Sequence, residues 1–293
     1  MREVISQQDQ ISDLMIKQLE HSGEFRVLKS LNIQDTLNKS DDSKKFIGCY
    51  VDVETTGKNH ENDKITEMAM IKFEFNNDGK IFRILDKFLE FEDPNGLYKI
   101  NDQQVKDFIK DSPSIFAHNA SFDRKFLERR FPIFKQSVFL CSMADVSWKE
   151  RNYDYKSLSY LVNQFGHFHK EHRALSDCEA GIFILSQTFY GGRESVLANL
   201  LFNARKNCGQ VRLIINGLPP SENDYLKTKG FQWDWNYRVS TKKMGAWGIF
   251  LNKSEVDKMV DWLDGFKNRF PALEIQTHIL NKYNRYSERI EYE

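Results

Sequence analysis

Residues 46–57 read FIGCYVDVETTG, and this stretch decides the fold of the chain. Its first eight residues are mostly apolar, β-branched or aromatic, which predicts a largely buried strand over 46–53. Positions i and i+2 of a strand project from the same face, so Asp52 and Glu54 are expected to point at one spot. Two converging carboxylates are costly unless a cation binds between them, and Mg²⁺ prefers oxygen ligands. The alternative is a strand end whose acids are simply solvated.

The sequence around this strand predicts an α/β fold. Strands are expected at 65–75 and 81–91, and the turn between them, NNDGK, is typical of a hairpin because Asn, Asp and Gly tolerate positive φ. Short strands and helices then alternate. The helices are predicted at 103–110, 121–130 (capped by Ser121), 155–165 and 174–189, and the strands at 114–118 and 138–141. Antiparallel strands followed by β-α units predict a mixed sheet flanked by helices.

Two further motifs carry acids at helix starts. Asp123 lies in the first turn after the strand that ends at Ala117-His118, where the helix dipole alone also favours an acid. The segment His172-Arg173-Ala174-Leu175-Ser176-Asp177 has a spacing that places His172 in a loop and turns Asp177 inward from the next helix. A surface histidine and an ordinary helix acid are the alternative interpretation. All three motifs are expected at the edge of the same sheet.

The three motifs, taken in this order, resemble the DEDDh group of DnaQ-like 3′–5′ exonucleases. Asp52, Glu54, Asp123 and Asp177 match the four acids of that group, and His172 matches its histidine. The segment 63–69, DKITEMA, also resembles the family's second strand. The resemblance covers residues 46–190, and it implies an RNase H-like mixed sheet flanked by helices.

The resemblance also implies a mechanism. The four acids would hold two divalent cations, Mg²⁺ or Mn²⁺, around the scissile phosphate, and His172 would act as general base. The product would be nucleoside 5′-monophosphates released from the 3′ end of a single strand, with DNA favoured over RNA. An exoribonuclease of the same superfamily is the alternative. The substrate pocket that the resemblance implies consists of Thr55, Thr56, His118, Asn119 and Phe122.

Residues 191–209 predict a connecting helix, and residues 210–293 predict a small α+β accessory module. Its strand 231–239 carries aromatic or apolar residues at every second position, from Phe231 to Val239. We favour the module's own core as the role of this face, with a helix capped by Ser254 covering it. The alternative is a stacking platform for single-stranded nucleic acid. Pieces of the module resemble an accessory unit behind some bacterial exonucleases, and docking of a polymerase or another protein through 210–293 is a further hypothesis.

The rest of the sequence bears on the location of the protein, on disulfides and zinc, and on its net charge. Residues 1–45 predict a polar tether with a short helix, and neither an apolar signal core nor a membrane-spanning run is evident, so a cytoplasmic location away from membranes is expected. Four scattered cysteines argue against disulfides. A zinc site at His167, His169 and His172 lacks a fourth ligand, and we interpret the first two as loop residues. The chain has 42 Lys and Arg residues and 42 Asp and Glu residues, so its formal net charge is zero. This balance excludes a protein that binds nucleic acid mainly through bulk positive charge. It does not exclude a nuclease whose site gains positive charge from bound metal ions.

Overall fold

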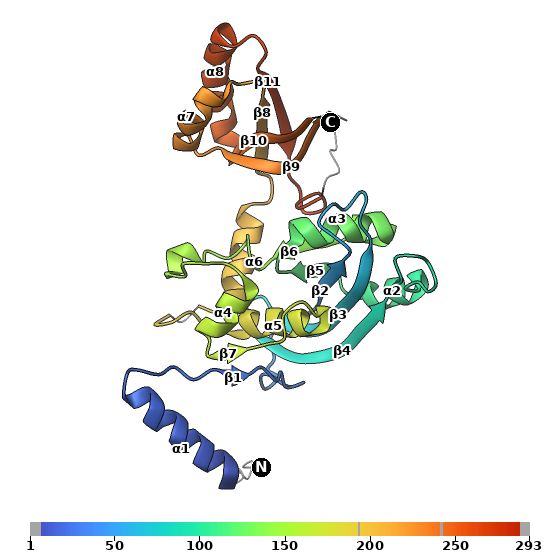
Figure 1. The fold of residues 1–293 in the computed structure, drawn as a ribbon, viewed down its shortest axis with the longest axis vertical. Helices are drawn as coiled ribbons and strands as arrows, with labels where there is room; N and C mark the ends of the chain where they lie inside the picture. Colours follow the sequence, from blue (N-terminus) through green and yellow to red (C-terminus); the bar gives the residue numbers. More distant parts are fainter. Residues whose placement is uncertain (1–6, 193, 241–242, 288–293) are drawn as a thin grey trace.

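The computed structural model describes residues 7–192, 194–240 and 243–287 and places a five-stranded sheet at the centre of the larger body (Figure 1). The sheet order is β4-β3-β2-β5-β6, with β2, β3 and β4 antiparallel and β5 and β6 parallel to β2. The strands are β2 Lys45–Thr55, β3 Ile65–Asn76, β4 Ile81–Phe91, β5 Ser114–Ala117 and β6 Val138–Cys141. This is an RNase H-like arrangement, so the predicted fold class is confirmed.

Helices cover both faces of the sheet because residues of β2 alternate between two apolar cores. Cys49, Val51 and Val53 pack on one face, with α2 and α3, whereas Tyr50 packs on the other face, with α4, α5 and α6. Their bounds are α2 Asp102–Ile109, α3 Ala120–Arg130, α4 Leu158–Gln164, α5 Ala174–Ser186 and α6 Val196–Lys206. Single 3₁₀ turns lie at Pro132–Gln136 and Lys149–Arg151. Asn119, not Ser121, holds the N-cap position of α3.

Helix α5 approaches the sheet most closely at Gly181. A Cβ built on Gly181 would lie 2.0 Å from the Tyr50 ring, so only glycine allows this approach. Gly181 follows Asp177 by one helical turn, and Tyr50 precedes Asp52 by two strand positions, so each pair shares a face. The packing of Gly181 on Tyr50 therefore brings Asp177 opposite Asp52.

The chain before β2 runs along the outside of this body (Figure 1). Helix α1 covers Gln7–His21, and a two-residue strand, β1 Lys29–Ser30, pairs in parallel with β7 His167–Phe168. The sequence predicted the helix but not the β1–β7 pair, which joins segments almost 140 residues apart. No helix among the described residues is long and apolar enough to cross a membrane.

The C-terminal module, residues 210–287, is α+β as predicted. Its four antiparallel strands have the order β11-β8-β10-β9, with η3 Pro220–Glu222, α7 and α8 beside them. The bounds are β8 Val211–Asn216, α7 Asn223–Thr228, β9 Gln232–Ser240, β10 Lys243–Leu251, α8 Lys253–Arg269 and β11 Glu274–Ile279. The predicted Ser254 cap is wrong, because Asn252 and Glu255 form a capping box and Ser254 lies within the helix.

The aromatic face of the module is described only at its start. Phe231 is buried in the module's core with Leu213 and Leu263, which agrees with the core interpretation. Trp233 remains 37% exposed and meets Trp247 edge to face at 5.5 Å. The side chains of Trp235, Tyr237 and Val239 lie outside the described residues, and the stacking hypothesis stays untested there.

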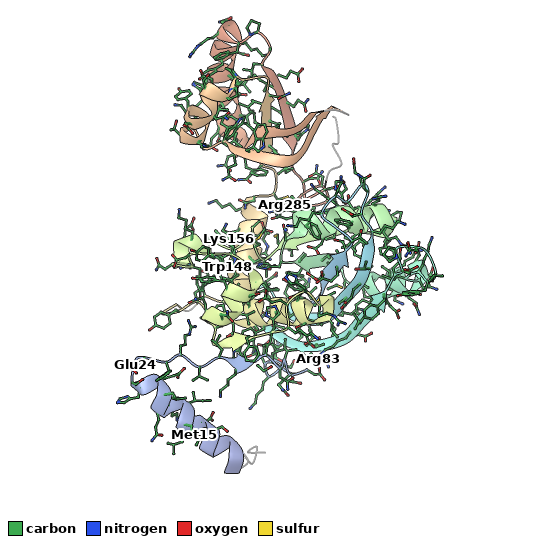
Figure 2. The ribbon with its side chains drawn as sticks, in the orientation of Figure 1. Met15, Glu24, Arg83, Trp148, Lys156 and Arg285 are labelled. Carbon is green, nitrogen blue, oxygen red and sulfur yellow. The ribbon has the colours of Figure 1, made fainter. Side chains whose placement is uncertain are left out.

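The chain returns from the module to the larger body near its C-terminus, where Arg285 lies between the two (Figure 2). Arg285 pairs with buried Asp145, which follows β6. The fully buried Arg124 of α3 donates to the carbonyls of Tyr283 and Arg285 and pairs with Glu128. The tail, for which the sequence offers no interpretation, is therefore fastened to α3.

We predict opposite effects of the same substitution at two helical glycines. Gly181→Ala forces α5 away from Tyr50 and lowers the free energy of unfolding by roughly 1–3 kcal/mol, the usual cost of overpacking. Gly265→Ala in α8, where a Cβ meets nothing within 4 Å, raises that free energy by up to about 1 kcal/mol through helix propensity. Urea unfolding of both variants checks this, and equal midpoints would contradict the close packing.

Candidate active site

Three carboxylates meet at the carboxyl end of β2. Asp52, Glu54 and Asp177 each offer one ligand oxygen, and these oxygens lie within 4.8 Å of one another. The first two come from alternate positions of β2, and Asp177 comes from the first turn of α5. The structure thus brings together three of the acids that the sequence predicts.

Asp123 approaches the same strand end from α3. Its carboxylate is buried, and its Oδ1 accepts a hydrogen bond from the backbone N–H of Val53 at 3.3 Å. It is not a member of the three-acid group among the described residues, but its charge acts directly on Asp52. The fourth predicted acid therefore lies beside the group and is anchored to the strand between Asp52 and Glu54.

The acids perturb each other because they lie close together and away from water. Burial, followed by repulsion from Asp123, Asp177 and Glu54, raises the pKa of Asp52 well above its usual range. Burial also raises the pKa of Asp123, to about 7, although backbone N–H groups oppose the shift. The pKa of Glu54 is raised by burial and by Asp177.

The donor set suits hard divalent cations. It consists of carboxylate oxygens alone, and no Lys or Arg of the described chain forms an ion pair with Asp52, Glu54 or Asp123. Arg173, the nearest candidate, pairs instead with Glu67 at 3.1 Å. His169 bonds to Asp177, and His172 and Arg173 act on Glu54 without pairing with it, so the remaining counter-charge would come from Mg²⁺ or Mn²⁺.

His172 lies at the mouth of this group. It is exposed and sits immediately before the cap residue of α5, with a left-handed φ of 59° that is uncommon for a non-glycine residue. Its charge lowers the pKa of Glu54 in opposition to the neighbouring acids, which places it near that carboxylate. A strained backbone at a site residue is typical of functional positions.

Glu67 of β3 holds the loop that carries His172. Its Oε1 accepts from the backbone N–H of Ala174, the first residue of α5, at 3.1 Å, and its Oε2 pairs with Arg173. A carboxylate at a helix N-terminus is favoured by the unsatisfied N–H groups there. Glu67 therefore fixes the two residues that follow His172.

His169 is the site residue that sequence reasoning missed. Its side chain is only 2% exposed, and its Nε2–H donates to Oδ1 of Asp177 at 2.8 Å. His169 lies in the loop after β7, as predicted, but its bond to Asp177 gives it a role in the site that the sequence did not signal. The prediction of His167 as a loop residue is wrong, because it lies in β7, which pairs with β1. His167 bonds the carbonyl of Phe165 through its Nδ1, and no histidine joins a metal-binding group in the described ranges, so zinc gains no support.

His118 turns both ring nitrogens inward. Nε2–H donates to the Lys156 carbonyl at 2.7 Å, so Nδ1 accepts from the Ser142 hydroxyl at 2.9 Å, and Ser142 in turn accepts from Tyr50. Burial lowers the pKa of His118 to about 4, which keeps the ring neutral. His118 thus links the strand that carries Asp52 to the loop at Lys156.

The other predicted substrate residues line the same end of the sheet. The hydroxyl of Thr55 donates to the Gly57 carbonyl at 2.6 Å, and that of Thr56 donates to Asp63 at 3.1 Å. Asn119 accepts from Ser121, and the partly buried Phe122 packs on Phe126 with ring centroids 5.0 Å apart. These contacts shape the loop and helix start beside the acids, and substrate contact by these residues stays a prediction.

Comparison with known proteins gives partial matches. No protein-family profile matches the chain. The chain is 29% identical over 175 residues to DNA polymerase III PolC-type of Staphylococcus saprophyticus, covering 50% of this chain and 12% of the relative. The corresponding protein of Staphylococcus haemolyticus is 28% identical over 170 residues, covering 49% and 11%. The chain therefore spans only about a tenth of the length of these curated relatives.

Solved structures give a weaker match. Crystal structures of E. coli Exonuclease I, one with a 5cy-dA13 oligonucleotide and one a zinc-bound complex with single-stranded DNA, superpose with TM-scores of 0.40 and 0.39 at 14% identity. Each match covers 59% of this chain and 48% of that structure.

The raised carboxyl pKa values predict how stability depends on pH without metal. A carboxyl whose pKa is higher folded than unfolded binds more protons in the folded state, so stability falls as pH rises toward the folded pKa. The lowered pKa values of His118 and His278 act only below about 6.5, so pH 6.5–8 isolates the acids, among which Asp123 has a pKa raised to about 7. In EDTA the melting temperature should fall across this window, and Mn²⁺ should restore it at pH 8.

Asp52→Asn provides the control for that measurement. Removing one carboxyl relieves the repulsion, so the variant should melt higher than the wild type at pH 8 in EDTA and gain less from Mn²⁺. A wild-type melting temperature that stays level or rises between pH 6.5 and 8 would count against the clustered acids.

Proposed function

We propose that this chain, which resembles the DnaQ-like 3′–5′ exonucleases, is a metal-dependent exonuclease that removes nucleoside 5′-monophosphates from the 3′ end of single-stranded nucleic acid. The observation that carries the proposal is the convergence of Asp52, Glu54 and Asp177, with Asp123 beside them, at one strand end. No Lys or Arg of the described chain forms an ion pair with Asp52, Glu54 or Asp123. DNA is the favoured substrate because the relatives are DNA polymerases.

In this proposal the four acids hold two divalent cations, which when bound supply positive charge to the scissile phosphate and acidify a water molecule. His172 accepts the proton of the attacking water at a ring nitrogen, and its exposure lets it pass that proton to solvent. His169 keeps the Asp177 carboxylate oriented through the Nε2–H bond. Glu54 and the backbone near Thr55 contact the terminal 3′-hydroxyl in this proposal, as the resemblance implies.

A second candidate is an exonuclease that works with a DNA polymerase. Its support is that this chain is similar to a short part of much longer polymerases, which places a related segment and a polymerase in one protein. An exoribonuclease with the same site is the other alternative, since the acids act on the phosphate and not on the sugar.

The central test is hydrolysis of 3′-end substrates. The wild type with Mg²⁺ or Mn²⁺ should shorten 5′-labelled single-stranded DNA one nucleotide at a time, and EDTA or Asp52→Ala should stop it. A matched RNA strand and a duplex with a 3′ overhang, run beside it, determine substrate preference. Undiminished cleavage by Asp52→Ala, or no cleavage of any strand by the wild type, would overturn the proposal.

Loss of the general base should slow the chemical step and leave substrate binding intact. His172→Ala should lower kcat by roughly 10²–10⁴, with little change in KM. The exposed His21 at the end of α1 provides a matched control, and His21→Ala should keep the wild-type rate. Single-turnover kinetics check this, and equal rates for the two variants would show that His172 is not the general base.

A further inference from the structure

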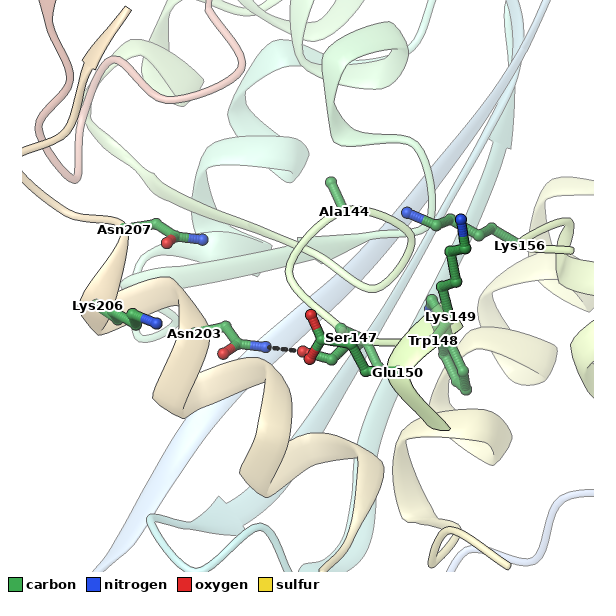
Figure 3. Close-up of a pocket in the computed structure, with 10 residues that line it drawn as sticks. Ala144, Ser147, Trp148, Lys149, Glu150, Lys156, Asn203, Lys206 and Asn207 are labelled. Carbon is green, nitrogen blue, oxygen red and sulfur yellow. Dashed lines mark hydrogen bonds between the residues drawn. The ribbon is translucent and has the colours of Figure 1, made fainter. Parts of the chain in front are cut away.

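A polar pocket lies between the segment after β6 and the end of α6 (Figure 3). Because β6 runs parallel to β2, with β5 between them, the segment after β6 starts at the same edge of the sheet as the acids. Its volume is about 320 Å³. Lys149 and Lys156 extend from one side, and Lys206 and Asn207 lie on the other (Figure 3). The floor is fixed, because Nδ2 of Asn203 donates to Ser147 Oγ and to the Asp145 carbonyl, both at 3.0 Å.

The pocket carries a net positive charge. Three lysines line it against a single acid, Glu150, and none of the three forms an ion pair in the described parts of the chain. A lysine at the end of α6 is favoured by the helix dipole, which accounts for Lys206 but not for Lys149 and Lys156 on the facing loop. Exposed ammonium groups that converge without carboxylate partners favour an anionic ligand.

One hydrogen-bond chain runs from the backbone of Lys156 to Tyr50 of β2, the strand that carries Asp52 and Glu54. The Lys156 carbonyl accepts from His118, which is linked through Ser142 to Tyr50, two residues before Asp52 on the same strand face. His118 also lies five residues before Asp123. The backbone of the loop that carries Lys156 is therefore bonded to His118, at the end of the strand that leads into the helix of Asp123.

An exposed aromatic residue, Tyr155, directly precedes Lys156 in the chain. Tyr155 is 67% exposed, and its ring meets Tyr160 edge to face at 5.3 Å, which leaves ring surface open to solvent. Aromatic rings that alternate with lysines are the elements that bind single strands, through base stacking and phosphate contacts respectively. The lysines alone would also suit a small free anion, whereas an exposed ring adds binding only for a ligand that carries a base.

We propose that this pocket binds the phosphate backbone of a single-stranded nucleic acid whose 3′ end lies at the acids, and that Tyr155 stacks on one of its bases. The inference rests on the proposed function, because the acids define where the strand ends. Lys149, Lys156 and Lys206 neutralise the phosphates upstream of the terminal nucleotide. In this proposal the metal site binds only the scissile phosphate, and the pocket binds the phosphates further along the strand.

Binding of a 5′-fluorescein-labelled oligothymidylate of 15 nucleotides tests the inference, measured by anisotropy in Ca²⁺ at several salt concentrations. The variant Lys149→Ala/Lys156→Ala/Lys206→Ala should weaken binding at least tenfold and lower the salt slope by about 2, since each single-strand phosphate contact contributes about 0.7. Tyr155→Ala should weaken binding roughly tenfold, and Tyr155→Phe should restore it.

The control variant also removes three positive charges, but from a part of the surface away from the pocket. Lys99→Ala/Lys106→Ala/Lys110→Ala changes three exposed lysines at and near α2 and should leave affinity and salt slope close to wild type. Equal losses in the two triple variants, unchanged affinity in the pocket variant, or no binding by the wild type overturns the inference. A wild type that binds the strand through the pocket lysines but cleaves nothing overturns the proposed function alone.

Discussion

The contact between Gly181 and Tyr50 sets the distance between α5 and β2, and the rest of the site depends on that distance. A side chain at 181 would separate the two elements, and Asp177, one turn earlier on the same helix face, would move with α5. The acids repel one another and raise their own pKa values, so they do not hold the elements together. Apolar packing holds the acids together against their repulsion, and a bound cation would remove much of that cost.

A network of polar contacts then orients the acids that this apolar packing brings together. Glu67 accepts from the first N–H of α5, His169 donates to Asp177, and Val53 donates to Asp123. Each contact fixes either an acid or the backbone beside one. The left-handed backbone at His172 is tolerated because α5 begins two residues later and is held by Glu67.

The sequence predicts the sheet and its acids well because both follow from local pattern. Alternation places Asp52 and Glu54 on one face of β2, and helix starts place Asp123 and Asp177, so the fold class and three of the clustered acids follow without tertiary information. The residues missed are those whose role depends on contacts distant in sequence. His169, which bonds to Asp177, directly follows the strand that pairs with Lys29–Ser30, and Arg285 meets Asp145 across 140 residues. Contacts of this kind leave no periodicity or residue spacing in the sequence from which they could be predicted.

The zero net charge of the chain conceals a separation of charge on its surface. Acids gather at the end of β2, while three lysines that form no ion pair in the described part of the chain lie around the end of α6 and the loop after β6. One hydrogen-bond chain from Tyr50 to Lys156 joins the two regions. Screening limits electrostatic effects between exposed charges to about 10 Å, so the two regions act on a bound strand separately. The acids repel a polyanion until cations bind to them, whereas the lysines attract it with or without cations. Net charge therefore excludes a uniformly basic binder, and the local arrangement supports a strand held beside a metal-dependent site.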